Sequence, residues 1–401
     1  MVGSVVGPGR WIPEAPRTTA FQAPGCRYPC PVIRLRRGTV TKAEPAHPGL
    51  VELLVNVEDR SEPALGYPAL TGPIAVGDVV VLNTTALARR LGTGGYHLVV
   101  AVEGQEDLDP PVEGHIMKLR YTPQQAKVLA VEEPSSPHRQ AFESAEDLGG
   151  MPVVWLPLHS MVGAACAGAR TEGVARVVYV MTDGAALPLW FSRQIHELRE
   201  AGLIDEVITA GQALGGDHEA VNLFSALLAA RAVSEADVTI VADGPGKVGT
   251  HTRWGASDVS SGLTLSVAAI LGGHPIAAVR LNFADSSYRH YGLSPHSATV
   301  LSKVAPPSVS VALPALEGKR RVMVGNAFRE AGIDERHRVV EVDGRPAVDL
   351  LLRHGLSAAT MGRRLEEEPD FFHAAGAAGI LAGRIAGEAA VAAPREPVVG
   401  A

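Results

Sequence analysis

The sequence contains few cysteines and few aromatic residues: 3 of its 401 residues are cysteine, and 5% are aromatic. Three cysteines cannot form a disulfide framework, so we expect reduced thiols and a cytoplasmic location. Cys26 and Cys30 have C-x-x-x-C spacing, but a zinc knuckle would need a second such pair. The scarcity of cysteine therefore excludes a disulfide-stabilised secreted domain.

Long apolar runs are also absent. No run reaches about 18 residues, the length of a membrane-spanning helix, and residues 1–30 contain no apolar signal-peptide core. We therefore expect no membrane segment and interpret residues 1–30 as a leader. An Ala-rich segment from about 370 to 390 predicts a long helix, whose apolar face either covers a sheet or joins a homo-oligomer.

The sequence carries no excess of positive charge. Its formal net charge is -7, whereas nucleic-acid binders usually present a basic face. The basic strip from Arg34 to Arg37 is too short to reverse this balance, so we expect no nucleic-acid partner. With 46% hydrophobic and 20% charged residues, the composition is typical of a globular chain long enough for two domains.

The first predicted domain, over residues 31–125, consists of short β-branched runs separated by glycines. Val51–Val57, Val79–Leu82 and His97–Val102 each have the length and composition of a strand. Glycines between them supply turns that need a positive φ. The pattern predicts a small all-β domain with a barrel-like sheet.

The second predicted domain, over residues 150–390, alternates apolar runs with helical patterns. Strands that are apolar on both sides and separated by helices are typical of a mostly parallel sheet with helices on both faces, as in Rossmann-like α/β proteins. The carboxyl ends of such strands form one rim, where open sheets bind ligands. The predicted strands are Val153–Leu156, Val177–Met181, Glu206–Thr209, Val238–Ala242 and Ile276–Leu281, with a later one at Arg338–Val342.

The most informative loop follows the run that ends at Ala242 and contains the pattern G-x-G-x-x-G. Glycines let backbone amides approach an anion closely, so the loop is a candidate phosphate-binding loop. The alternative is a structural Gly-rich turn, because Arg253, Trp254 and Gly255 intervene before any helix. The candidate ligand-binding residues are Gly244, Gly246, Lys247, Gly249, Thr250 and Thr252.

A second loop follows the run that ends at Thr209. Asp217 at a helix start is explained by capping, whereas neighbouring polar residues are explained either by a solvated helix start or by a site. Asp183, at the end of another run, is a cap or a ligand group. The candidates in the second loop are Gly215, Gly216, Asp217, His218, Glu219 and Asn222.

A third loop, after Phe283, is rich in ionisable side chains. Histidines are natural general bases or metal ligands near neutral pH, but ligation here would require the loop to fold back. The alternative is a surface loop with incidental histidines. The candidate catalytic residues are Asp285, Arg289, His290 and His296.

These motifs resemble those of a bacterial family known as the domain-of-unknown-function 3866 family. The segments that carry the resemblance are GQALGGDHEAVN, GPGKVGTHT, RHYGLSPHS, GYPALTGPIAVGDVVVLNTTA and LGTGGYH. The resemblance implies the same two-part architecture and no particular activity. Two positions depart from the family pattern: Pro295 precedes His296 in place of a second histidine, and His251 stands in place of a glycine. The first departure disfavours a paired-histidine metal site, and the second weakens the phosphate interpretation.

Three functions remain open. The first is an enzyme acting on a small anionic, phosphate-bearing or nucleotide-like metabolite at the carboxyl-end rim, because three polar loops follow consecutive strands. The second is a ligand-sensing or scaffold protein without turnover. The third is a metal-dependent hydrolase using Asp217, His218, Asp285 and His290, although no metal site is assigned. The cofactor is not indicated.

Overall fold

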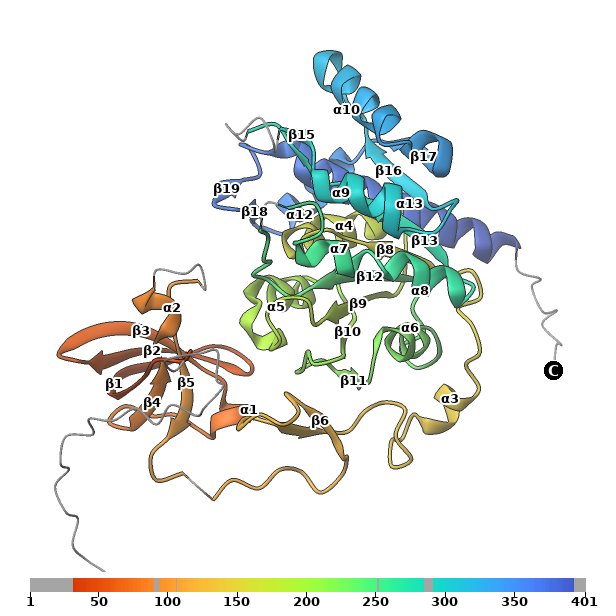
Figure 1. The fold of residues 1–401 in the computed structure, drawn as a ribbon. Helices are drawn as coiled ribbons and strands as arrows, with labels where there is room; N and C mark the ends of the chain where they lie inside the picture. The colour runs from red at the N-terminus through yellow and green to blue at the C-terminus, as the bar shows by residue number, and fades with distance from the viewer. Residues whose placement is uncertain (1–31, 90–93, 106, 251, 285–290, 393–401) are drawn as a thin grey trace, which may run out of the picture. The chain divides into compact units, whose positions relative to one another are not determined.

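The computed structural model describes residues 32–89, 94–105, 107–250, 252–284 and 291–392, and the predicted leader lies outside this part (Figure 1). The chain divides into two compact units. The first runs up to Glu44 and includes Glu52–Gly66 and Pro73–Glu106. The second comprises the remaining segments and the chain from Asp107 onward. We describe each unit by itself.

The first unit contains a closed five-stranded barrel with the order β1-β2-β3-β5-β4. β4 is antiparallel to β1, β3 is parallel to β5, and the order β4-β1-β2-β3 is that of a Greek key. Alternate side chains such as Val55 and Leu82 fill the interior. The predicted all-β barrel is confirmed. Its strands are β1 (Leu35–His47), β2 (Leu50–Val57), β3 (Arg60–Gly66), β4 (Val79–Asn83) and β5 (His97–Val102), with helix α2 (Thr85–Ala88) between β4 and β5. Helix α1 (Pro68–Thr71), between β3 and β4 in the sequence, is assigned to the second unit.

The second unit is built on an eight-stranded sheet with the order β11-β10-β9-β12-β8-β13-β16-β17. Every neighbouring pair is parallel, as the apolar runs predicted. The strands are β8 (Pro152–Trp155), β9 (Val177–Thr182), β10 (Glu206–Ala210), β11 (His218–Ala220), β12 (Val238–Asp243), β13 (His274–Ala278), β16 (Ser310–Pro314) and β17 (Arg338–Val342).

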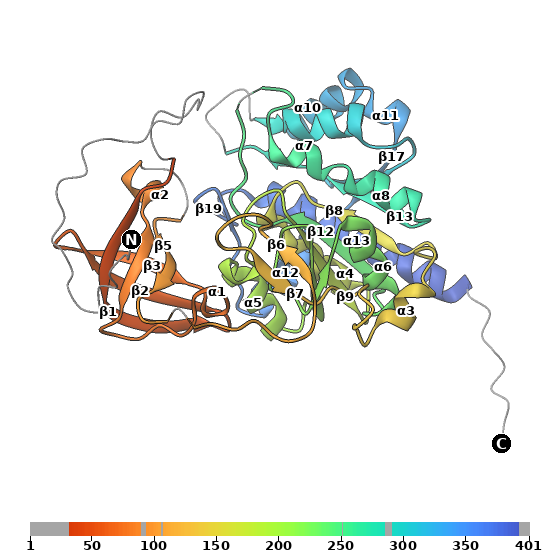
Figure 2. The same cartoon turned by 60° about the horizontal axis from the view of Figure 1, so that its bottom comes forward.

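Helices cover both faces of this sheet because its strands are apolar on both sides. Val154 and Ile240 pack on one face, whereas Val153 and Val241 pack on the other. The first face carries α4 (Val162–Thr171), α5 (Arg193–Glu200), α12 (Arg345–Arg353) and α13 (Pro369–Ala392). The second carries α6 (Leu223–Ala232), α8 (Thr264–Ile270), α10 (Gly318–Glu330) and α11 (Ile333–Arg336), with α3 (Arg139–Glu143) beside α6 (Figures 1 and 2).

Shorter elements occupy the connections. A hairpin of β6 (Ile116–Lys118) and β7 (Ala126–Val128) belongs to the second unit. The others are η1 (His159–Met161), η2 (Leu189–Phe191), α7 (Ser257–Ser261), β14 (Leu281–Asn282), β15 (Gly292–Leu293), α9 (Pro295–Thr299), the π-helix η4 (Val300–Val304), β18 (Ala359–Thr360) and β19 (Arg363–Arg364).

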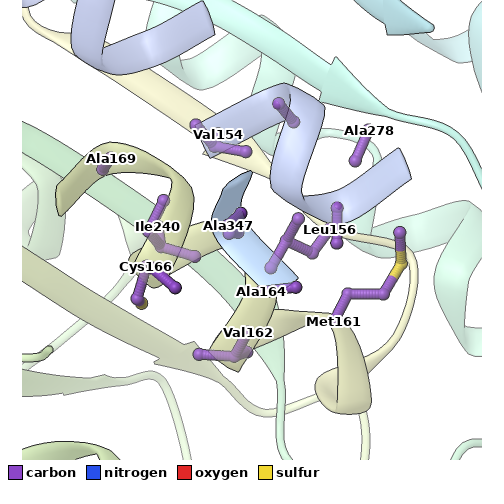
Figure 3. Packing of buried hydrophobic residues seen from close by; sticks show 14 of the residues in the cluster. Val154, Leu156, Met161, Val162, Ala164, Cys166, Ala169, Ile240, Ala278 and Ala347 are labelled. Atoms are coloured by element: carbon purple, nitrogen blue, oxygen red, sulfur yellow. The ribbon is translucent and has the colours of Figure 1, made fainter. Parts of the chain in front are cut away.

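The C-terminal helix α13 packs against α4 through small residues. A Cβ added at Gly379 would overlap the carbonyl oxygen of Ala165, so the two backbones approach closely. Figure 3 shows α4 residues Ala164 and Cys166 near Val154 and Ile240 of the sheet. Of the two roles predicted for the C-terminal helix, covering the sheet is the one its buried residues serve. None of the described helices has the length and apolar character needed to cross a bilayer.

The connections of the sheet predict a ligand-binding crevice at the carboxyl end of β12. The chain leaves β8 and β9 through α4 and α5 on one face, whereas it leaves β12 through α8 on the opposite face. Adjacent parallel strands whose connections depart to opposite faces leave a crevice beyond their carboxyl ends, where open α/β sheets bind ligands. The fold therefore directs attention to the loops after β8, β9 and β12.

Candidate functional site

Asp243, the last residue of β12, places a buried carboxylate at this crevice. Its side chain is only 2% exposed. Its Oδ1 accepts hydrogen bonds from the Thr182 hydroxyl at 2.7 Å and the Gly184 amide at 3.2 Å. Its Oδ2 is buried and has no hydrogen-bond partner among the described residues. Burial raises the pKa of Asp243, so the carboxyl holds a proton more readily than an exposed aspartate does.

Lys247 follows Asp243 in the Gly-rich loop and faces its Oδ2 atom. Its Nζ lies 3.8 Å from Asp243 Oδ2, which is an ion pair too long for a hydrogen bond. The Nζ atom is itself buried without a hydrogen-bond partner in the described part of the chain. Burial lowers the pKa of Lys247, while the charges of Asp258 and Asp243 act in the opposite direction. Two oppositely charged groups thus meet here with unused hydrogen-bonding capacity.

The Gly-rich loop that carries Lys247 is shaped by contacts within itself and with the loop after β9. Gly244 has no space for a Cβ because the carbonyl oxygen of Ala186 occupies it, and Gly246 has a φ of +94°. The Thr250 hydroxyl donates to the carbonyl of Gly255, and the Thr252 hydroxyl accepts from the Gly255 amide. These two hydroxyls therefore close the loop, and the next helix, α7, begins only at Ser257.

His296, in α9, lies beside the Gly-rich loop. Its Nδ1 lies 3.6 Å from Oδ1 of Asp258, and its Nε2 donates to the carbonyl oxygen of Thr252 at 3.3 Å. Gly249 lies beside the same ring. The helix that carries His296 continues directly into the π-helix η4, a rare distortion that is frequent at functional sites. The third predicted loop thus brings one of its candidates to the Gly-rich loop.

Arg280, whose guanidinium donates a hydrogen bond to Met361 Sδ, is a second cation whose charge acts on Lys247. It follows β13, its amide bonds the Ser297 hydroxyl, and its charge contributes to lowering the pKa of Lys247. Ser294, at the start of α9, has a buried hydroxyl oxygen with no hydrogen-bond partner among the described residues. The cluster Asp243, Lys247, Asp258, Arg280 and His296 is hereafter called the rim cluster.

His159 contacts the rim cluster through the main-chain carbonyl of Asp243. Its Nδ1 lies 3.1 Å from the carbonyl oxygen of Asp243, which can only accept, so Nδ1 carries the hydrogen. Its Nε2 then accepts from the Ser192 hydroxyl at 2.7 Å. Burial lowers the pKa of His159 to about 4, so the ring is neutral near pH 7. This neutral imidazole connects the loops after β8 and β9 to the end of β12.

Asp183 stands between Thr182 and Gly184, which both donate hydrogen bonds to Asp243. Its Oδ2 accepts a hydrogen bond of 2.8 Å from the amide of Gln212, which connects the loops after β9 and β10. Its charge contributes to raising the pKa of Asp243. Asp183 is exposed, so this arrangement leaves its other oxygen accessible.

The second predicted loop does not share the rim with the Gly-rich loop, contrary to the expectation that consecutive strands would bring them together. Asp217 bonds the amide of Val207 and the guanidinium of Arg199, and His218 lies 3.4 Å from Glu206 at the start of β10. The loop doubles back to start β11, the edge strand three positions from β12, about 14 Å away. The sequence did not reveal that short extra strand.

The remaining residues of that loop have structural partners. Glu219 forms an ion pair of 3.1 Å with the fully buried Lys118 and accepts from the Gly215 amide. Gly216 leaves no space for a side chain next to the carbonyl of Val207. Asn222 is the N-cap of α6, where its side chain accepts from the Ser225 amide. These contacts explain the polar residues of this loop without a ligand.

Three predicted catalytic residues, Asp285, Arg289 and His290, lie outside the described residues. Within the part that is described, no group of three or more His, Cys, Asp or Glu side chains is arranged to hold a metal ion. The geometry available for chemistry is therefore that of the rim cluster.

Sequence reasoning included Lys247 and His296 but missed Asp243, Asp258 and Arg280 as site residues. A signal existed for Asp243, since it is an acidic residue at the end of an otherwise apolar buried strand. Asp258 and Arg280 carry no such signal, because only the folded chain brings α7 and the end of β13 to the Gly-rich loop.

Comparison with known proteins adds a family but no activity. A family model described as "Protein of unknown function (DUF3866)" matches residues 63–379 of the chain. No curated protein and no solved structure matches it.

Proposed function

We propose that this chain, which belongs to the DUF3866 family of proteins of unknown function, is an enzyme that binds a small anionic metabolite at the rim cluster. One observation carries the proposal: Asp243 Oδ2 and Lys247 Nζ are buried, face each other at 3.8 Å and have no hydrogen-bond partner in the described chain. Unpartnered buried charges are costly and are usually retained only where a ligand or a reaction uses them.

Each member of the rim cluster has a role in this proposal. Lys247 and Arg280 supply positive charge for an anionic group, and their partial burial strengthens that attraction. Asp243, whose pKa is raised by burial, holds a proton more readily than an exposed aspartate and is the candidate proton donor. His296, oriented by Asp258 and by the carbonyl of Thr252, is the second proton carrier. A phosphate on the ligand would lie against the Gly-rich loop.

Thermal-shift measurements with a panel of small anionic metabolites test the proposal. The proteins compared are the wild type, Lys247→Met, the double variant Asp243→Asn/Lys247→Met, and Lys303→Met as a control that removes an exposed lysine. We expect a ligand present at 100 times its Kd to stabilise the wild type and the control by about 2.7 kcal/mol. The same ligand should leave both Lys247 variants unshifted.

The double variant guards against misfolding as an explanation. Replacing both partners of the ion pair leaves no uncompensated buried charge, and asparagine at position 243 keeps an oxygen that can accept from Thr182 and Gly184. We therefore expect the double variant to melt close to the wild type. Stabilisation of all four proteins alike, or of none, would reject the site. A ligand that binds through Lys247 and is recovered unchanged after prolonged incubation would support ligand sensing in place of catalysis.

We extend the proposal to location and partners. A cytoplasmic location is supported by the three cysteines and the lack of a disulfide framework. A nucleic-acid partner is disfavoured by the net charge of -7 and because Arg34 and Arg36 pair with Glu58, and Arg37 pairs with Glu103. The expected partner is a small molecule.

A further inference from the structure

The amine of Lys247 is in an unusual state for a lysine. A lysine ammonium has three donors, and leaving all of them unsatisfied in a buried position is unfavourable. The Lys247 side chain is 12% exposed, and its Nζ has no hydrogen-bond partner among the described residues. Losing the proton removes this penalty, and burial favours that loss more strongly than the charges of Asp258 and Asp243 oppose it.

A lysine amine that is desolvated, or placed next to another cation, is activated as a nucleophile toward carbonyl groups. Lys247 meets the first condition, since its Nζ is buried and has no hydrogen-bond partner among the described residues. We propose that Lys247 forms a covalent imine with the carbonyl group of an anionic aldehyde or ketone. This inference rests on the proposed function and names its substrate class.

The neighbouring carboxyl group completes the reaction. The lone pair of Nζ adds to the carbonyl carbon, the carbon–oxygen π bond breaks, and a proton moves from nitrogen to oxygen to give a carbinolamine. Protonated Asp243 then donates its proton to the hydroxyl, which leaves as water while the nitrogen lone pair forms the C=N bond. The product is a protonated imine, and Asp243 becomes the carboxylate that faces it at the 3.8 Å position. No oxidant or reductant is needed.

Two further features fit this substrate class. The Thr182 hydroxyl and the Gly184 amide hold Oδ1 of Asp243, so Oδ2 is the oxygen directed at the amine. Arg280 supplies a second positive charge for the anionic group of the substrate. An amine that faces a carboxyl group and has no hydrogen bonds to the described residues is suited to addition to a carbonyl, because the carboxyl group can supply the proton that the reaction needs.

Trapping with a hydride reagent tests the proposal on the full-length protein. Glyoxylate, the smallest anionic aldehyde, is incubated with the protein near pH 6.5 in the presence of sodium cyanoborohydride, which reduces an imine to a stable amine. Peptide mapping by mass spectrometry then locates the adduct. Burial lowers the pKa of Lys247 and so raises its fraction of neutral amine, and we therefore expect Lys247 to be labelled faster than the exposed Lys303.

Variants assign the roles. Lys247→Arg should abolish the fast adduct, Lys303→Arg should leave it unchanged, and Asp243→Asn should slow it by about 100-fold through loss of the proton donor. A melting curve for each variant shows whether it is folded. Equal labelling of all lysines, or no adduct at Lys247 in folded wild-type protein, would overturn the imine. If an anionic ligand still binds through Lys247 in that case, the proposed function stands without it, whereas failure of both measurements removes both.

Discussion

His159 illustrates how one buried side chain can support a site that it does not enter. Its ring lies between the Asp243 carbonyl, the Ser192 hydroxyl and the hydroxyl of Tyr179. All of these contacts suit the neutral ring, whose pKa burial lowers to about 4. Protonation would place an uncompensated charge in the core.

We therefore expect His159 to make stability depend on pH. In the unfolded chain the ring takes up a proton near pH 6.5, whereas in the folded chain it stays neutral until about pH 4. Between these two pH values the unfolded state therefore binds more protons than the folded state. The contribution of His159 to the free energy of unfolding is fully present above pH 6.5 and is lost as the pH falls. Urea unfolding should show a loss of about 2 kcal/mol from this residue between pH 7 and pH 5.

The control for this experiment is His159→Gln, whose amide can donate to Asp243 and accept from Ser192 without titrating. The variant should lose about 2 kcal/mol less than the wild type over the same interval. Identical pH dependence of the two proteins would show that the ring is not held neutral.

At the residue scale, the sequence indicated the polar loops but not the burial of individual groups. Lys247 and His296 were predicted because their loops are rich in glycine or histidine. The pairing of Asp258 with His296 joins positions 38 residues apart and depends on the contact of α7 with α9. No local pattern encodes such a contact.

At the scale of elements, the α4–α13 pair depends on glycines that remove side-chain volume. Gly168 meets the carbonyl of Gly376, and Gly379 meets that of Ala165. Glycine is a weak helix former, so its presence in a long helix is explained by this close approach. Gly387, in the same helix, is exposed and has open space around it.

These two positions give opposite predictions for the same substitution. Gly379→Ala should destabilise the protein by about 1–3 kcal/mol because the methyl group forces the helices apart. Gly387→Ala should stabilise it by about 0.5–1 kcal/mol through helix propensity alone. Chemical denaturation of both variants measures the difference. Equal effects of the two substitutions would contradict the close packing of α4 and α13.

Most elements of the second unit could be predicted because each strand is a continuous apolar run. Two strands of the parallel sheet were not predicted: β16 (Ser310–Pro314), a short run before a loop, and β11, which has the three residues His218–Ala220 and no apolar run. The position of β11 is set by a distant residue. This residue is Lys118, which bonds the carbonyls of Gly211 and Ala220 and pairs with Glu219. A contact with a lysine about 100 positions earlier cannot be read from local periodicity.

At the scale of the whole molecule, sheet order determines which residues share a crevice. The chain forms β8 first, passes to β9, β10 and β11, and then returns to insert β12 between β9 and β8. This return places Asp243 at the centre of the sheet and leaves Asp217 and His218 at one edge. The sequence predicted the parallel sheet and its rim, but strand order depends on which apolar surfaces pack together in three dimensions.

The strand order also predicts a pattern of hydrogen exchange. β8, β9 and β12 each have strand neighbours on both sides and helices on both faces, so their amides should exchange slowest. The edge strands β11 and β17 should exchange faster. Exchange followed by mass spectrometry on the intact protein checks this order, and protection of the edge strands equal to that of β12 would contradict the topology.

The closure of the N-terminal barrel limits how that unit can recognise other chains. Because β1 pairs with β4, the hydrogen-bonded sheet of five strands closes on itself and has no edge strand. Recognition by strand addition needs unpaired main-chain groups along such an edge, so a peptide must instead be held by side chains on the outer wall or by loops. Deleting β1 would leave main-chain groups of both β2 and β4 unpaired. These two exposed edges would make the barrel prone to aggregate.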